Sequence, residues 1–263
     1  MNKIGKLFNL GSIFGIQFQL HFTWFIIFIL VTILLVYPDF SQWLYWLLGI
    51  ITSLLFFASV IAHELAHSLV GRANGIPINR IVLFIFGGVA QMSEEVTNYN
   101  AELKMAVAGP ACSLVIGGLF GLLWFFFHGI IVESVTIMIL WLAIMNTALA
   151  VFNLIPGFPL DGGRVLRSLL WRFSGNYNRS TRIAARIGQG VGYLFILAGI
   201  LIIFLHPFDL SWFDGIWLAF IGWFITSAAS ASYREVLWQE ALRRTASQVT
   251  IPESSVTSPD ITD

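Results

Sequence analysis

The chemistry that this sequence suggests centres on the run His63-Glu64-Leu65-Ala66-His67. Two histidines four residues apart lie on one face of a helix, so both imidazoles can bind one Zn²⁺ ion. The glutamate between them is placed to act as the general base of a metalloprotease. The alternative is that both histidines pack between helices and Glu64 pairs with one of them. A carboxylate within a membrane span costs about 2.5–3.5 kcal/mol on insertion scales, which favours a functional role.

A catalytic zinc site needs a third protein ligand, and Asp161 is the strongest candidate. It follows an apolar stretch that two prolines and a glycine interrupt at residues 156–159. Prolines remove helix hydrogen-bond donors and so break the helix end. The broken end can direct the Asp161 carboxylate toward the neighbouring helices. Arg72 and Arg164 are expected to mark the cytoplasmic face of a membrane. Glu64 precedes Arg72 by eight residues and Asp161 precedes Arg164 by three, so both carboxylates are expected just inside that face. The alternative role for Asp161 is that of a helix-ending turn residue.

The composition indicates which elements must position these side chains. Apolar residues make up 57% of the 263 residues, charged residues make up 11%, and the mean hydropathy is +0.83. A soluble domain carries about 25% charged residues, so the chain is predicted to be a polytopic membrane protein in a lipid bilayer. The net charge is zero, which gives no attraction to nucleic acid. The single cysteine, Cys112, excludes an intramolecular disulfide and a cysteine-based zinc site.

Apolar stretches of about 20 residues can cross the hydrocarbon core, and the sequence offers six. The predicted fold class is therefore an all-α polytopic membrane protein with six transmembrane helices and a small membrane-associated β-sheet. The predicted spans are Phe22–Val36 with its flanks, Trp43–Val70, Met105–Phe127, Val132–Ile155, Gly188–Leu205 and Gly215–Ala231.

The basic residues predict the orientation of these spans. With six spans, the outer loops are residues 37–42, 128–131 and 206–214, and none contains lysine or arginine. Basic residues concentrate in cytoplasmic loops, so both termini are predicted to be cytoplasmic.

Two segments have the pattern of strands. Residues Ser12–Leu20 alternate between apolar and polar positions, as a half-buried strand does. Residues Ile78–Gln91 are rich in β-branched and aromatic residues, too short to span, and interrupted by Gly87-Gly88, so we expect a hairpin. The predicted sheet thus combines one N-terminal strand with a hairpin between the second and third spans.

Several motifs together resemble the site-2 protease family of intramembrane zinc metalloproteases. They occur in the family's order and cover about residues 10–235. The matching motifs are His63-Glu64-Leu65-Ala66-His67, Phe86-Gly87-Gly88-Val89, Ala108-Gly109-Pro110, Asn153-Leu154-Ile155-Pro156 and Leu160-Asp161-Gly162-Gly163-Arg164.

The resemblance implies one zinc ion per chain with His63, His67 and Asp161 as ligands and Glu64 as the base. It also implies a catalytic role for Asn153 near the scissile peptide, where its amide could bind the substrate backbone or the oxyanion. The implied partner is a single-pass membrane-protein substrate, and the implied location is the plasma membrane of a prokaryotic cell.

The resemblance also suggests a domain layout. Residues 1–21 form a cytoplasmic N-terminus with a strand, residues 22–235 form the six-span protease core, and residues 236–263 form a cytoplasmic tail. The chain looks most like the branch in which a pair of CBS domains follows the spans. The run Tyr233-Arg234-Glu235-Val236 resembles the lead-in to such a pair, so the tail is expected to be disordered or a shortened lead-in.

The predicted function is hydrolysis of a peptide bond in or near the transmembrane segment of a membrane-protein substrate. The rival hypotheses are a divalent-metal transporter that uses His63, His67 and Asp161 as a transit site, and a catalytically inactive membrane scaffold.

Two further expectations concern the surroundings of this site. We expect residues Ile81–Phe86 to present an unpaired strand edge beside His63 that holds the substrate extended, with Phe86, Gly87 and Gly88 touching it. The alternative is that this edge pairs with Ser12–Leu20 and has a structural role. We also expect residues Arg164–Arg186 to lie along the cytoplasmic membrane surface, with a helix that ends near Phe173.

Overall fold

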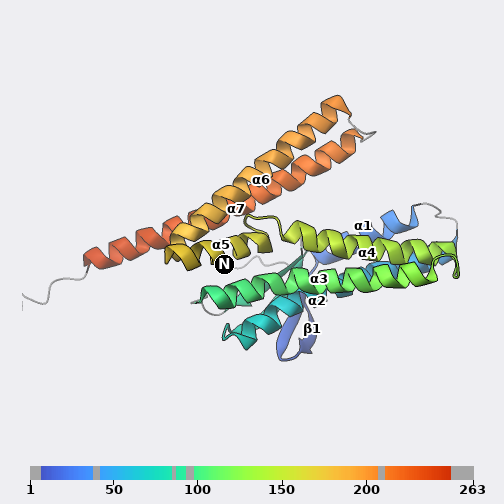
Figure 1. The fold of residues 1–263 in the computed structure, drawn as a ribbon, viewed down its shortest axis with the longest axis horizontal. Helices are drawn as coiled ribbons and strands as arrows, with labels where there is room; N and C mark the ends of the chain where they lie inside the picture. Colours follow the sequence, from blue (N-terminus) through green and yellow to red (C-terminus); the bar gives the residue numbers. More distant parts are fainter. Residues whose placement is uncertain (1–6, 38–41, 85–86, 93–97, 207–210, 250–263) are drawn as a thin grey trace, which may run out of the picture.

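In a computed structural model of the chain, residues 7–37, 42–84, 87–92, 98–206 and 211–249 are described, and they form four strands and seven helices (Figure 1). The strands are β1 (Leu7–Ile13), β2 (Ile16–His21), β3 (Ile78–Phe84) and β4 (Gly87–Met92). The helices are α1 (Thr23–Val36), α2 (Trp43–Ala73), α3 (Tyr99–Phe127), α4 (Glu133–Asn153), α5 (Asp161–Ser174), α6 (Tyr177–Leu205) and α7 (Trp212–Val249).

Five of these helices are long and apolar enough to cross a membrane, judged by length and composition: α2, α3, α4, α6 and residues Trp212–Leu242 of α7. Between 17% and 33% of each apolar window is buried inside the protein, so most of each span is left to face lipid. The chain is therefore a multi-pass membrane protein.

The prediction of six spans is wrong at the first apolar stretch. Helix α1 has 14 residues and measures about 21 Å at 1.5 Å per residue, against about 30 Å of hydrocarbon. The residues before it form strand β2 instead of lengthening the helix. Because hydropathy is high on both sides of Phe22, the apolar pattern does not show where the backbone changes from strand to helix.

The sheet has four strands in the order β1-β2-β3-β4. The hairpins β1–β2 and β3–β4 are antiparallel, and β2 pairs with β3 in parallel, with Phe18 opposite Ile81. The buried face of the sheet packs against Ile61 and Leu65, which lie beside the histidines of α2. The residues of this buried face are Ile16, Phe18, Leu20, Ile81 and Leu83. The sheet therefore braces the part of α2 that carries the predicted zinc ligands.

The prediction of one N-terminal strand over Ser12–Leu20 is wrong, because that segment contains a tight turn. Phe14 and Gly15 both have positive φ values, 51° and 75°, and they reverse the chain between β1 and β2. The alternation that suggested a strand continues through the turn, which hides it in the sequence. The prediction of a hairpin over Ile78–Gln91 is confirmed by β3 and β4.

The helices form two groups (Figure 1). Helices α1 to α4 lie side by side, with α2 in contact with α1, α3 and α4. Helices α6 and α7 pack closely as a pair that is inclined to the first group. Helix α5 packs on both α3 and α6, so it joins the two groups.

The basic segment Arg164–Arg186 is divided between α5 and α6. Helix α5 ends at Ser174, where Gly175 takes a left-handed conformation with φ of 63°. Trp171 packs edge-on against Tyr99 of α3 and Tyr177 of α6. Helix α6 begins at Tyr177, well before the predicted start at Gly188, because the segment with arginines continues as helix. Helix α7 extends past residue 235 to Val249.

Candidate active site

His63 and His67 face the same side of α2 and are both buried. Their Nε2 atoms lie 3.1 Å apart. Asp161 Oδ2 lies 3.3 Å from His63 Nε2 and 3.1 Å from His67 Nε2. Within the described part of the chain, these three residues form a group whose ligand atoms lie within 4.8 Å of one another, close enough to hold a metal ion. The structure thus brings together the three predicted ligands from segments that are distant in sequence.

Helix α3 fixes the orientation of both imidazole rings. The Nδ1 atom of His67 donates a hydrogen bond to the carbonyl oxygen of Met105 at 2.6 Å. The Nδ1 atom of His63 lies 2.9 Å from the hydroxyl of Ser113. Because a carbonyl accepts only, His67 Nδ1 carries a proton, and Nε2 is the ring atom that faces Asp161. Partners of this kind orient the histidine ligands of metal sites, so the donor set fits zinc.

Gly109 of α3 lies directly over the two histidines. A Cβ atom at this position would come within 2.6 Å of His63 Nε2 and even closer to His67 Nε2. Pro110 follows it inside the helix. Glycine at 109 therefore leaves the space in which the Nε2 atoms can meet a ligand. Sequence analysis identified Gly109 only as part of a family motif, because residue spacing does not show which side chains of another helix it packs against.

A turn after α4 delivers Asp161 to the site. Helix α4 ends at Asn153, and α5 begins at Asp161 itself. Gly162 and Gly163 pack against the backbone of residues 154–158 so closely that a Cβ atom at either would overlap it. The two glycines therefore allow the turn to fold back against the first turn of α5, as the broken helix end suggested.

Helix α5 is anchored to α3 by two polar contacts. Arg167 donates from Nε to Glu102 Oε1 at 2.8 Å and from Nη2 to the same oxygen. Ser168 donates from its hydroxyl to the carbonyl of Tyr99 at 2.6 Å. Glu102 is fully buried, so this ion pair lies inside the protein. Sequence reasoning did not find it, because residue spacing within one helix does not show a partner on another.

The charge of Asp161 depends on its histidine neighbours. Burial of the carboxyl favours its neutral form, but hydrogen bonds with His63 and His67 outweigh this effect, and the pKa of Asp161 lies below the ordinary value for aspartate. Asp161 is therefore a carboxylate, which is the form that binds a metal ion. Arg164, one turn further along α5, adds a positive charge that acts on both Asp161 and Glu64.

The side chain of Glu64 extends from α2 to the edge of the sheet. A Cβ atom on Gly88 would lie 2.6 Å from Glu64 Cγ and 2.7 Å from Cδ, so the carboxylate side chain rests against the backbone of β4. The titratable groups that act electrostatically on it are His67, His63, Asp161 and Arg164. The predicted base is thus beside the predicted ligands, on the side that faces the sheet.

The prediction that Ile81–Phe86 presents an unpaired edge is wrong for the described residues of that segment. Strand β3 lies inside the sheet, with β2 on one side and β4 on the other. The alternative, pairing with Ser12–Leu20, is what occurs, since residues 17–20 of β2 pair with β3 in parallel. The edge strand beside Glu64 is β4, which contacts α2. Gly87 and Gly88 lie on β4, and Phe86 lies outside the described residues.

Asn153 lies in the last turn of α4. Its Nδ2 atom donates to the carbonyl of Leu149 in the same helix at 2.9 Å. The structure therefore places Asn153 at the entrance to the turn that carries Asp161, with its amide bonded to its own helix.

Comparisons with known proteins agree with this geometry. A model of "Peptidase family M50" matches residues 51–136 and 128–199. A Synechocystis sp. protein described as a candidate zinc metalloprotease is 41% identical over 262 residues, with 94% of this chain and 65% of that protein covered. A zinc metalloprotease of Methanocaldococcus jannaschii is 38% identical over 201 residues, which cover 76% of this chain and 55% of that protein.

A solved structure, the site-2 protease from Methanocaldococcus jannaschii, is similar with a TM-score of 0.61 and 33% identity, covering 87% of this chain and 95% of that chain. The fold is that of a membrane-embedded peptidase family, and the group of His63, His67 and Asp161 has donor atoms of the kind that hold zinc. The chain belongs to Peptidase family M50. It spans 65% and 55% of the length of the two curated relatives described above.

Proposed function

We propose that the protein is an intramembrane zinc endopeptidase that cleaves membrane-protein substrates in or near a transmembrane segment. The observation that carries the proposal is the convergence of Asp161 on His63 and His67, beside Glu64 of the spanning helix α2. Family membership supports it, because the relatives carry the name zinc metalloprotease.

His63, His67 and Asp161 would hold the zinc ion, one per chain. When bound, zinc lowers the pKa of a water molecule and polarises the peptide carbonyl. Glu64 is placed to take the proton from the attacking water and deliver it to the leaving amine as the C–N bond breaks. Ser113 and the Met105 carbonyl keep the two imidazoles in their orientation during these steps. Gly109 keeps the space above the ligand atoms free.

The substrate we propose is a single-pass membrane protein that binds in extended form along β4. A helical peptide hides its carbonyls in hydrogen bonds, so it must unwind before water can attack. An edge strand can hold the unwound segment by main-chain pairing. Gly87 and Gly88 support this role because they carry no side chain, and the β4 backbone at Gly88 lies directly beside Glu64. Phe86, which lies outside the described residues, is also proposed to touch the substrate.

Asn153 is proposed to contact the substrate near the scissile bond. The support is its position at the end of α4, just before the turn to Asp161. To reach a substrate carbonyl, its amide must exchange the bond to Leu149 for one to the substrate.

The orientation we propose puts both termini on the cytoplasmic side of a prokaryotic plasma membrane. The loops 128–131 and 206–214 lack basic residues, and the arginines of α5 and α6 lie at the opposite end of the helices. Glu64 lies nine residues before the end of α2, about 14 Å inside that face. The N-terminal sheet then occupies the cytoplasmic half, and α1 crosses the outer half.

We further propose that the protein belongs to the branch in which CBS domains follow the membrane core. The support is helix α7, which continues beyond the core through the run at Tyr233–Val236 to Val249.

One experiment tests the proposed function against the transporter and the scaffold. The full chain in liposomes is incubated with single-span membrane polypeptides, and fragments are read by mass spectrometry. Glu64→Gln should lower cleavage by roughly 10²–10⁴-fold, the usual contribution of general acid–base catalysis. Its zinc content should match the parent, and Glu133→Gln, at the exposed start of α4, should cleave as the parent does. Zinc flux that persists in Glu64→Gln without cleavage by the parent would instead indicate a transporter, and neither activity would indicate a scaffold.

A further inference from the structure

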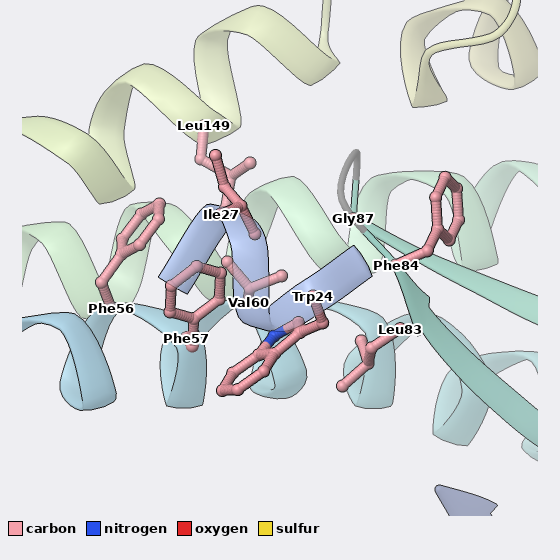
Figure 2. A pocket seen from close by; sticks show the side chains of 9 residues that line it. All are labelled: Trp24, Ile27, Phe56, Phe57, Val60, Leu83, Phe84, Gly87 and Leu149. Atoms are coloured by element: carbon pink, nitrogen blue, oxygen red, sulfur yellow. The ribbon is translucent and has the colours of Figure 1, made fainter. Parts of the chain in front are cut away.

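An apolar pocket lies next to the candidate active site, between α1, α2, α4 and the β3–β4 hairpin (Figure 2). We propose that this apolar pocket binds a large apolar side chain of the substrate, such as phenylalanine or leucine, within one or two residues of the scissile bond. The proposal rests on the proposed function and adds a determinant of cleavage specificity, namely which substrate residue lies next to the scissile bond.

The position of the apolar pocket follows from two elements that it shares with the site. Val60 lines the pocket and lies one helical turn before Glu64 on the same face of α2. Gly87 lines the pocket at the start of β4, and its neighbour Gly88 touches the Glu64 side chain. Adjacent strand residues are about 3.3 Å apart, so a peptide paired with β4 beside Glu64 carries its next side chains to the pocket.

The size and lining of the apolar pocket indicate what it binds. Its volume is about 210 Å³, smaller than the roughly 300–1,000 Å³ of sites that enclose a whole small ligand. One large side chain suits this volume better than a whole ligand does. Trp24 of α1 packs edge-on against Phe57 of α2 at 4.9 Å, which gives the pocket an aromatic wall. The aliphatic side chains of Ile27 and Leu149 complete the lining from α1 and α4.

A substrate side chain fits this place better than a lipid chain because the hairpin forms one wall. Leu83 and Gly87 connect the apolar pocket to the edge strand, where backbone pairing would place a peptide. A lipid chain has no group that pairs with that edge. A lipid occupant is nevertheless an outcome that the experiment below detects.

The first experiment fills the apolar pocket. Single-span leucine–alanine polypeptides with a central Gly-Pro break carry alanine, leucine or phenylalanine at each position around the cut. The parent should prefer leucine or phenylalanine over alanine at one fixed position by roughly tenfold or more, as hydrophobic pockets do. Leu149→Trp, which fills the pocket, should reverse this preference toward alanine. Val151→Trp is the matched control on α4, since its side chain is 59% exposed and does not line the pocket, and it should keep the parent preference.

Two results would overturn the proposal while leaving the proposed function intact. The first is cleavage by the parent with no preference at any position. The second is a preference that Leu149→Trp and Val151→Trp leave equally unchanged.

The second experiment needs no turnover, so it separates failure of the apolar pocket from failure of the proposed function. The same polypeptides carry a benzoylphenylalanine at each position in turn and are photolysed with the Glu64→Gln variant. Crosslinks at one position should map to Phe56, Phe57 or Leu149 and should disappear in Glu64→Gln/Leu149→Trp. Crosslinks to lipid alone, or to helix surfaces away from these residues, would overturn the proposal. Pocket crosslinks together with an inactive parent would overturn the proposed function while still assigning the pocket to the substrate.

Discussion

At the scale of single residues, Gly109 leaves free the space around the Nε2 atoms of His63 and His67, two of the proposed zinc ligands. An added methyl group at this position would occupy the space of both Nε2 atoms. We expect Gly109→Ala to lose most of its zinc, because the histidines must move apart to admit the methyl group. Gly118→Ala is the matched control on the same helix, since a Cβ atom there meets nothing within 4 Å. Metal analysis of both purified variants checks the prediction, and parent-like zinc in Gly109→Ala would contradict it.

A second prediction at the scale of single residues concerns the substitution of Asp161. Asp161→Ala removes the oxygen that lies 3.1–3.3 Å from both imidazoles, so bound zinc should fall sharply. The exposed Asp214, at the start of α7, offers a control, and Asp214→Ala should keep the parent zinc content. Zinc measured per chain by mass spectrometry decides the matter. Undiminished zinc in Asp161→Ala would remove this residue from the ligand set.

The candidate site was predictable where its signal is local. Four-residue spacing brings His63 and His67 to one helix face, and the prolines at 156 and 159 mark a broken helix end before Asp161. Ser113 and the Met105 carbonyl, which orient the rings, could not be found in this way. They lie on α3, and only the packing of α3 against α2 brings them to the histidines.

At the scale of elements, helix α5 needs an anchor because its first residue is a predicted metal ligand. The buried pair of Glu102 and Arg167 supplies that anchor on α3. Removing one partner of a buried ion pair costs about 3–5 kcal/mol, because it leaves an unpaired buried charge. We therefore expect Glu102→Ala to lower the unfolding temperature and to weaken zinc binding together.

A surface pair provides the control for this prediction. Arg182 and Glu240 lie 3.7 Å apart and are partly exposed, and such pairs contribute about 0–1 kcal/mol. Glu240→Ala should therefore leave both the unfolding temperature and the zinc content close to the parent values. Thermal unfolding in detergent, followed with metal analysis, measures both. Equal effects of the two substitutions would show that the buried pair does not position α5.

The elements themselves were predictable to different degrees. The hairpin of β3 and β4 follows from a β-branched run with a glycine pair. The pairing of β2 with β3 could not be predicted in this way. It joins segments about 60 positions apart through backbone hydrogen bonds, and every sequence has the backbone groups that form them.

The interior position of β3 has a consequence for mutagenesis. Leu83→Pro should disrupt the sheet, since β3 is paired on both sides and Leu83 is buried.

At the scale of the whole molecule, glycines allow α6 and α7 to pack closely as a pair. A Cβ atom on Gly192 would overlap Thr226, and one on Gly199 would lie 2.5 Å from the carbonyl oxygen of Gly215. Small residues of this kind let helix backbones approach closely in membranes. Helix α5 contacts both α3 and α6, so it connects the α6–α7 pair to the other helices.

One substitution should force helices α6 and α7 apart. Gly192→Leu should destabilise the protein by about 1–3 kcal/mol, the usual cost of overpacking. Gly190→Leu, two residues earlier on the exposed side of α6, should have little effect because nothing lies within 4 Å of its Cβ position. Unfolding temperatures of the two variants measure the difference. A stable Gly192→Leu variant would mean that α6 and α7 tolerate separation.

The distance in sequence between the ligands also has a consequence for synthesis of the protein. His63 and Asp161 are 98 positions apart, and ribosomes add about 5–20 residues per second. For roughly 5–20 s after α2 is made, the nascent chain carries both histidines and the glutamate without their carboxylate partner. The site becomes complete when the turn after α4 has been translated and α5 has docked. Under the proposed function, the nascent enzyme therefore cannot cleave the newly inserted helices of other proteins until its own synthesis is well advanced.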